Sequence, residues 1–276
     1  MLDDVVDFLI CPVCGDGLSL GDRVLRCTQG HAFDVARQGY VSLLTGSQSP
    51  GTADSTAMVA AREAFLGAGH FDPLAEAVAG ACRTDVKVIA DAGAGTGHYL
   101  SRALDRIPGA VGIALDVSKH AIRRAARAHP RLGAVVADVW RPLPLGDRTV
   151  DVVLNVFAPR NGAEFARVLR DDGALVVVTP TARHLAPLVE RLGLLSVDES
   201  KERRVAESLG GHFVEAGQSV HEFEMALGHE AVEAVVGMGP SAWHTAPEDM
   251  RRKIMELPKT SYVTASFRMS TFKRPS

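Results

Sequence analysis

The sequence predicts an α/β protein in which a doubly wound, mostly parallel sheet follows a small N-terminal zinc-binding module. Three observations lead to this prediction. Apolar runs alternate with helix-length amphipathic stretches from residue 87 onward, a glycine-rich loop follows the first run, and a cysteine–histidine pattern lies near the N-terminus. Alternating strands and helices give a parallel sheet covered on both faces, with ligand sites at the carboxyl ends of the strands.

The length of 276 residues allows one large and one small domain. No apolar stretch approaches the roughly 20 residues of a membrane span, and the start Met1–Asp4 lacks the basic residues of a signal peptide. We therefore expect a cytoplasmic protein with no membrane partner, in which four cysteines argue against a disulfide framework. The net charge is −3, but basic residues gather in 119–131 and 251–274. These clusters permit RNA binding without showing it, because solvated helix faces have the same composition.

The N-terminal pattern is Cys-x2-Cys followed by Cys-x3-His and comprises Cys11, Cys14, Cys27 and His31. Three thiolates and one imidazole can surround a zinc ion tetrahedrally, and four protein ligands leave no position open for water. We therefore predict one structural zinc ion per chain. The metal would supply much of the stability of a module that buries little apolar surface. Cys82 lies on a helical pattern and is expected to be a buried apolar residue.

The predicted domain organisation has three parts. Residues 1–44 form the zinc module, 45–56 form a linker of small and turn-forming residues, and 57–276 form the larger domain. The apolar runs that predict its parallel strands are 87–90, 110–115, 133–137, 150–155 and 173–179. Extended runs within 212–227 and 261–271 predict a hairpin-like pair that closes one edge of the sheet. A helix within 235–244 lies between them.

The glycine loop follows the first predicted strand. Asp91 precedes Gly93, Gly95 and Gly97, and glycines at alternate positions tolerate positive φ and let the backbone approach a ligand. The spacing differs from the dinucleotide fingerprint, and the chain has no P-loop lysine motif. Asp116 ends the next strand, where a carboxylate can accept hydrogen bonds from a ribose. This set resembles the class I S-adenosylmethionine-dependent methyltransferases, in which an aspartate placed like Asp91 lies near the methionine amino group of the donor.

Two independent modules together resemble the RlmA-type 23S ribosomal RNA guanine-N1 methyltransferases. The resemblance rests on the cysteine–histidine set with 33–44, on 61–70, and on the short stretches 115–119, 157–159 and 183–185. Stretches 137–140, 154–161 and 238–244 are similar to the actinobacterial branch, typified by the tylosin-resistance methyltransferase. That branch modifies a guanine in a hairpin loop of domain II of 23S rRNA, at the wall of the peptide exit tunnel.

The resemblance implies S-adenosylmethionine as the methyl donor and a homodimer whose cleft holds the rRNA hairpin, with the zinc modules as recognition arms. It also raises the hypothesis of macrolide resistance in the host. Asp138 would contact the adenine amino group, although a surface loop aspartate would look the same. Phe71 and His184 would lie near the donor, although His184 could equally be a helix-start histidine bonded to backbone. The complete donor set that we expect is Phe71, Asp91, Gly93, Gly95, Thr96, Gly97, His98, Tyr99, Asp116, Asp138 and His184.

Methyl transfer to guanine N1 requires the nitrogen, the methyl group and the sulfur to lie in line, and the base must leave its stack. We expect Phe157 and Trp243 to be stacking platforms, with packing in the core as the alternative for both. Asn155 and Arg160 are expected to bind the guanine edge. The sequence identifies no general base.

Two other functions remain open from the sequence. A small-molecule methyltransferase of a biosynthetic pathway would share the donor motif but would not need the zinc module. A non-catalytic, zinc-dependent RNA-binding protein would need the module, but it would not need Asp91, Asp116 and the three glycines.

Overall fold

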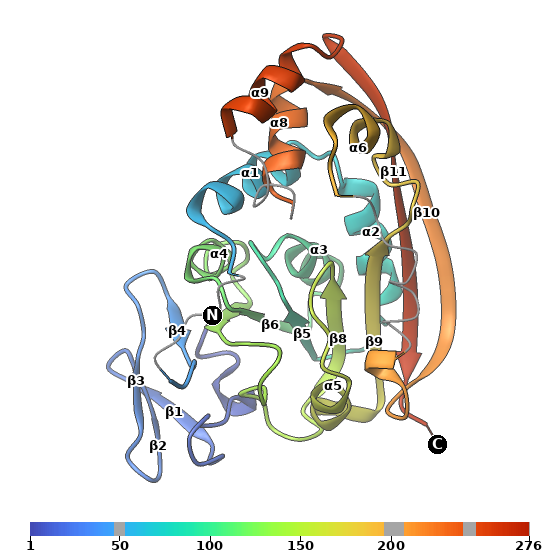
Figure 1. Cartoon of the computed structure of the whole chain (residues 1–276). Helices are drawn as coiled ribbons and strands as arrows, with labels where there is room; N and C mark the ends of the chain where they lie inside the picture. Colours follow the sequence, from blue (N-terminus) through green and yellow to red (C-terminus); the bar gives the residue numbers. More distant parts are fainter. Residues whose placement is uncertain (47–52, 196–206, 240–246, 276) are drawn as a thin grey trace.

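The computed structural model describes residues 1–46, 53–195, 207–239 and 247–275 (Figure 1). Within these residues the chain forms an eight-stranded sheet in the order β10-β11-β9-β8-β5-β6-β7-β4 and a separate three-stranded sheet in the order β1-β2-β3. In this described part, no helix combines the length and apolar character needed to cross a membrane.

The predicted parallel strands are confirmed with shifted ends. They are β5 (Val88–Ala92), β6 (Val111–Asp116), β7 (Leu132–Val136), β8 (Val150–Val156) and β9 (Leu169–Pro180). The pairs β5–β6, β6–β7, β5–β8 and β8–β9 are all parallel. The expected edge pair is also present, because β10 (Val214–Gly228) and β11 (Thr260–Lys273) run antiparallel and β11 joins β9.

The sheet is buried on both faces, because alternate residues of each central strand enter two different apolar clusters. Ile89 and Ala114 belong to one cluster, whereas Val88 and Ile113 belong to the other. Among the described residues, seven helices contribute side chains to the first cluster: α1 (Thr56–Gly67), α2 (Asp72–Ala81), α3 (His98–Arg106), α4 (Lys119–Ala125), α6 (Ala186–Leu192), α8 (His229–Gly237) and α9 (Pro247–Met255). The second cluster is covered by α5 (Gly162–Val168) and by the N-terminal residues.

The zinc module comprises a 3₁₀ turn η1 (Val6–Phe8) and the strands β1 (Leu18–Gly21), β2 (Val24–Cys27) and β3 (Ala32–Asp34), and it lies at the lower left of Figure 1. The chain then enters β4 (Tyr40–Ser42), which pairs in parallel with β7 and was not predicted.

The module shares its core with the large sheet. Leu2, Val5 and Leu9 are buried in the second apolar cluster, and Leu9 forms a bridge with Leu145. Gly133 of β7 has no room for a side chain, because a Cβ there would overlap Val5. The domain boundary after residue 44 stays a prediction. The burial of Leu2, Val5 and Leu9 against the large sheet joins the two sides of that boundary.

We predict that Leu9→Ala lowers the stability of the whole chain by about 2–5 kcal/mol, because it leaves a cavity under the sheet. Val13→Ala is the control, since Val13 lies in the same module and is 57% exposed, and it should change stability by about 0.5 kcal/mol or less. Thermal unfolding checks both variants. Unfolding of the main domain at an unchanged temperature in Leu9→Ala would show that the module does not support the sheet.

Candidate functional site

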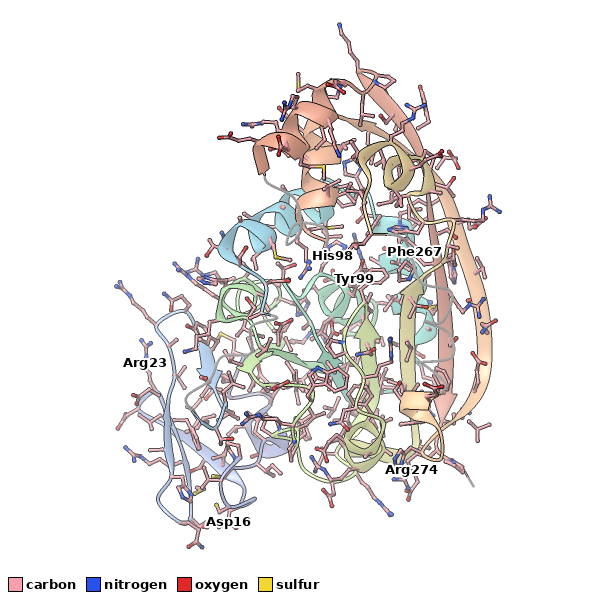
Figure 2. The ribbon with its side chains drawn as sticks, viewed as in Figure 1. Asp16, Arg23, His98, Tyr99, Phe267 and Arg274 are labelled. Atoms are coloured by element: carbon pink, nitrogen blue, oxygen red, sulfur yellow. The ribbon has the colours of Figure 1, made fainter. Side chains whose placement is uncertain are left out.

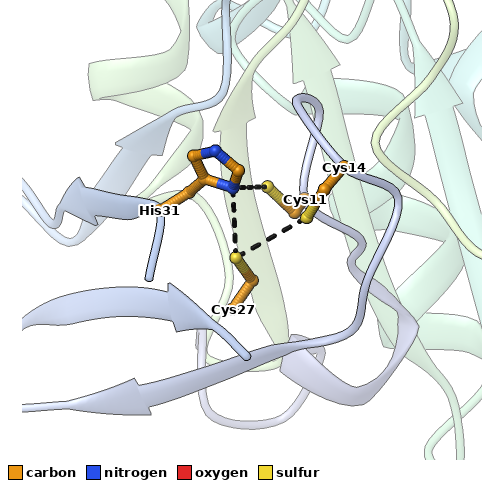
Figure 3. A group of neighbouring side chains, drawn as sticks. All are labelled: Cys11, Cys14, Cys27 and His31. Atoms are coloured by element: carbon orange, nitrogen blue, oxygen red, sulfur yellow. Dashed lines mark hydrogen bonds between the residues drawn. The ribbon is translucent and has the colours of Figure 1, made fainter. Parts of the chain in front are cut away.

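The four predicted metal ligands come together in the zinc module (Figure 3). Cys11 and Cys14 precede β1, Cys27 ends β2, and His31 precedes β3. Their ligand atoms all lie within 4.8 Å of one another. His31 presents Nδ1, which is 3.6 Å from Cys11 Sγ and 3.3 Å from Cys27 Sγ, while the Sγ atoms of Cys14 and Cys27 are 3.6 Å apart.

These distances fit a zinc ion. Tetrahedral bonds of ordinary Zn–S and Zn–N length place two sulfurs about 3.8 Å apart and a sulfur and a nitrogen about 3.6 Å apart. Three thiols and one imidazole also match the ligand preference of zinc, and all four positions are taken by protein. The cluster is therefore suited to a structural ion. Cys82 lies outside it, is buried as expected, and has its thiol pKa raised to about 12, chiefly by burial.

The carboxyl end of β5 carries a buried carboxylate without a partner. Asp91 is fully buried, and neither of its oxygens accepts a hydrogen bond within the described part of the chain. Burial, followed by the charge of Asp116, raises the pKa of Asp91 to about 8. An unpaired buried carboxylate is costly, so the site calls for a cationic hydrogen-bond donor, and an ammonium group of a ligand has that chemistry.

Asp116 at the end of β6 organises the glycine loop. One carboxylate oxygen accepts the N–H of Gly95 and the other accepts the N–H of Ser118, each at 2.8 Å. Each oxygen keeps a second lone pair, which suits the two hydroxyls of a ribose. Burial raises the pKa of Asp116, while the two backbone hydrogen bonds lower it. Gly93, Gly95 and Gly97 all have the positive φ that the sequence predicted.

A second segment, formed by the end of β8 and the loop 157–160 that follows it, lies directly against the glycine loop. The buried Asn155 donates through Nδ2 to the carbonyls of Ala92 at 3.0 Å and Pro159 at 2.7 Å. A Cβ on Gly93 would overlap Ala158, so this glycine makes room for the neighbouring loop. The expectation that Asn155 binds guanine stays a prediction, now limited to Oδ1, which has no partner among the residues that the structure describes.

Phe157 and Arg160 of this loop are available to a ligand. Phe157 is 43% exposed and has a φ of 57°, a costly conformation for a bulky residue that is often found at functional sites. Arg160 makes no hydrogen bond or ion pair with any described residue, and burial lowers the pKa of its guanidinium. Trp243, the other expected platform, lies outside the described residues.

An aromatic cluster adjoins the loop at the carboxyl end of the sheet. Figure 2 labels Tyr99 of α3 and Phe267 of β11, whose rings lie 6.2 Å and 5.3 Å from that of Phe157. The expected donor residues Phe71 and His184 are part of this cluster, with ring centroids 5.9 Å apart. Phe71 is buried, and His184 Nδ1 accepts the Ser266 N–H at 3.3 Å. The structure therefore shows the backbone bond of the alternative interpretation, while contact with the donor stays a prediction.

The remaining donor candidates lie around these loops. Thr96 and His98 line a pocket of about 400 Å³ between α1, α3 and α4. His98 Nε2 is buried with no partner in the described ranges of the chain, and burial lowers the His98 pKa. Asp138 follows β7 and accepts the Trp140 N–H at 3.0 Å, so it also shapes its own turn. Their roles toward the donor stay predictions.

Part of the basic character noted in the sequence serves the fold. Arg131 donates to the carbonyls of Leu104, Ile107 and Ala110 at the end of α3, and Arg274 pairs with Asp171. Exposed cations remain on and just beyond α4: Arg123, Arg124 and Arg127.

Arg62 lies beside the glycine loop, and no individual role was predicted for it from the sequence. The α1 helix carries this residue, its guanidinium pairs with Asp54, and its Nη1 would lie 3.2 Å from a Cβ added at Gly95. The sequence did contain an indication that Arg62 is functional, because this residue falls within the stretch 61–70 that resembles the RlmA-type enzymes.

We predict that Cys14→Ser loses the zinc ion and unfolds β1–β3, since three ligands rarely hold a closed structural site. Cys82→Ser is the matched control and should keep one zinc per chain. Elemental analysis of protein purified without chelator measures the metal. Full zinc content in Cys14→Ser, or no zinc in the unaltered chain, would contradict the assignment.

Comparison with known families agrees with both modules. Residues 9–48 match the family described as RlmA, N-terminal, and residues 89–173 match a methyltransferase domain. Among solved structures, the MccD protein aligns over 74% of this chain and 98% of its own, with a TM-score of 0.50 and 16% identity. An S-adenosylmethionine-dependent methyltransferase from Thiobacillus denitrificans, in complex with S-adenosyl-L-homocysteine, covers 77% and 97% with the same TM-score and 13% identity. These similarities show the methyltransferase fold.

Curated relatives match almost the entire chain. A putative 23S rRNA (guanine-N(1)-)-methyltransferase from Micromonospora griseorubida is 52% identical over 99% of both chains. The 23S rRNA (guanine(748)-N(1))-methyltransferase of Streptomyces fradiae is 50% identical over 96% of both, and a putative enzyme of Bacillus subtilis is 33% identical over 91% and 93%. The expected S-adenosylmethionine-dependent fold and the RlmA resemblance are thereby confirmed. This chain belongs to the RlmA family of 23S rRNA (guanine-N1)-methyltransferases.

Proposed function

We propose that this protein transfers a methyl group from S-adenosylmethionine to N1 of a guanine in a hairpin loop of domain II of 23S rRNA. The main support is the 50% identity, over 96% of the chain, to the Streptomyces enzyme named for guanine 748. The half-exposed Phe157 beside the glycine loop supports a base as acceptor. A structural zinc module is also consistent with a macromolecular substrate and disfavours a small-molecule methyltransferase.

The residues around the two loops have different roles in binding the donor and the guanine. Bound donor would supply a methyl group on a sulfonium, which is already a good leaving group; as the N1–CH3 bond forms, the CH3–S bond breaks and the N1 proton passes to water. Asp91 holds the ammonium group of the donor, and Asp116 holds its ribose while fixing the loop at Gly95. Asp138 contacts the adenine. We call the loop 157–160 after β8 the acceptor loop and the glycine loop 93–97 the donor loop. Because Asn155, at the end of β8, ties the acceptor loop to the donor loop, the base and the donor are kept in line, which lowers the barrier to displacement.

The loop after β8 holds the guanine that accepts the methyl group. The flipped guanine stacks on Phe157, and the guanidinium of Arg160 donates to the O6 and N7 edge, a common arrangement of arginine and guanine. Asn155 Oδ1 accepts from an N–H of the base. Trp243 is the second candidate platform, and Phe71, Thr96, His98, Tyr99 and His184 complete the proposed donor surroundings.

The wider proposal is a homodimer that holds the rRNA hairpin in its cleft. In this proposal, residues 1–44 act as the RNA-recognition module. Residues 45–56 are the linker, and 57–276 form the methyltransferase domain. The protein would act in the cytoplasm, where its substrate is made, and the modification would confer macrolide resistance on the host.

Methylation of protein-free 23S rRNA with a labelled donor tests the function. We expect label at one guanine, located by the block that N1-methylguanine causes in primer extension. Equal methylation of free guanosine would favour a small-molecule enzyme. Donor binding without any methylation of RNA would favour a non-catalytic RNA-binding protein.

We predict that Phe157→Ala weakens RNA binding by about 1–3 kcal/mol, because a stacked base loses its platform. Phe157→Tyr should keep most of the affinity, and Tyr262→Ala is the control, since Tyr262 is an exposed aromatic of β11. Filter binding and thermal unfolding are measured on the same samples. A fall in melting temperature that accounts for the whole effect would mean that Phe157 is structural.

We predict that donor affinity rises with pH between 6 and 7.5. The pKa of Asp91 is raised to about 8 in the free protein, so its carboxyl is mostly protonated in this range and must lose a proton to pair with an ammonium. The donor amino group stays mostly charged over the same range.

Calorimetric titration in buffers of different ionisation enthalpy measures both affinity and proton release. Asp91→Asn should bind the donor about tenfold to a hundredfold more weakly and abolish the proton release. The folded-state pKa of Asp91 is raised, so the free protein loses stability as pH rises from about 4 toward 8, because the carboxyl ionises in the unfolded chain while it stays protonated in the folded one. Asp91→Asn should therefore be relatively more stable than the unaltered chain at pH 8. Donor affinity that is flat with pH and releases no proton would contradict this role.

A further inference from the structure

We infer that Arg62 binds the carboxylate of the donor's methionine portion. This inference rests on the donor site proposed above. The α1 helix carries Arg62 against the glycine loop. A Cβ on Gly95 would lie 3.2 Å from Arg62 Nη1 and 3.6 Å from Cδ, so the side chain lies against the open Cα of this glycine. The guanidinium therefore lies beside the glycine loop, within reach of a ligand bound there.

The charges around the loop call for such a cation. The methionine portion of the donor carries an ammonium and a carboxylate on one carbon. Asp91 matches the ammonium, but Asp54, Asp91 and Asp116 would all repel the carboxylate. Arg62 is close enough to act on Asp116, whose pKa its charge lowers against the larger, raising effect of burial. A ligand carboxylate placed beside Arg62 gains an attractive partner within this acidic surrounding.

Tyr99 connects the two ends of the proposed methionine site. Burial raises the pKa of its phenol most, the positive charge of Arg62 lowers it, and Asp91 raises it further. Both charged groups therefore lie close enough to one hydroxyl to influence it. If the α-carbon of the methionine portion lay between Asp91 and Arg62, its ammonium would face Asp91 and its carboxylate would face Arg62.

The guanidinium is held in position and keeps donors for a ligand. Arg62 pairs through Nη1 with Asp54 and donates from Nη2 to the Met238 carbonyl at 3.1 Å, and its side chain is only 25% exposed. Within the described part of the chain, these contacts use two of its five N–H groups. They fix the fork between the segment before α1 and the end of α8, so little freedom is lost when a ligand binds.

The same contacts suggest a different role, in which Arg62 only joins α1 to α8. Titration with two ligands separates the two roles. One ligand is S-adenosylmethionine, and the other is decarboxylated S-adenosylmethionine, which keeps the sulfonium and the ammonium and lacks only the carboxylate. In Arg62→Gln we expect affinity for S-adenosylmethionine to fall about tenfold to a hundredfold. Affinity for the decarboxylated ligand should change by less than about twofold, because it makes no bond to Arg62.

The control is Arg251→Gln. Arg251 of α9 pairs with Glu233 of α8 at 3.6 Å and is 71% exposed, so this variant removes an exposed ion pair of α8 that lies outside the proposed donor site. Both affinities should be unchanged in it. If Arg62→Gln does not fold, as thermal unfolding would reveal, Arg62→Lys replaces it, and a partial loss confined to S-adenosylmethionine is expected.

Equal loss of both ligands in the Arg62 variant would overturn the inference in favour of a purely structural bond. Unchanged affinity for both ligands would also overturn it. Failure of the unaltered protein to bind either ligand would instead overturn the donor site itself.

Discussion

The burial of the sheet on both faces is the constraint from which the site follows. A strand covered on both sides has no place for a charged side chain along its length, so polar groups are confined to its ends. Asp91 and Asn155 lie at the carboxyl ends of the adjacent strands β5 and β8, and both are buried with oxygen atoms that find no partner in the described part of the chain. The fold tolerates this cost because a protonated Asp91 is far less expensive to bury than a carboxylate. A cationic group that pairs with the ionised carboxylate would offset the cost of burying its charge.

The two loops above these ends are built as one unit. Asn155 donates to the Ala92 carbonyl, and Gly93 leaves the space that Ala158 fills. A shift of the acceptor loop would therefore move the donor loop or break a buried hydrogen bond. For an in-line displacement this linkage is useful, because errors in the relative position of donor and acceptor cost more than errors in either position alone. It also explains Gly93 in a way that the motif did not, since a neighbouring loop occupies the space near its Cα.

Much of the fold could be predicted because it depends on local pattern. Apolar runs placed the five parallel strands, and the spacing of three cysteines and one histidine placed the metal cluster. The edge strand β4 was missed because it has only three residues and depends on pairing with β7, about ninety residues further along. The positive φ of Phe157 and the position of Arg62 were missed for a related reason. Both depend on contacts between segments distant in the sequence, which periodicity does not encode.

The shared core also changes how the zinc module should be understood. Its composition suggested an arm that folds on its own metal and is joined by a linker. The structure instead shows Val5 and Leu9 covering the face of the sheet opposite most of the helices, where doubly wound proteins place helices. The metal then stabilises more than the strands β1–β3, because the zinc module also contains the residues that bury β5–β7. An arm packed in this way holds a fixed position relative to Asp91 and Phe157. A fixed spacing suits a substrate such as an RNA hairpin, which is recognised largely by its shape.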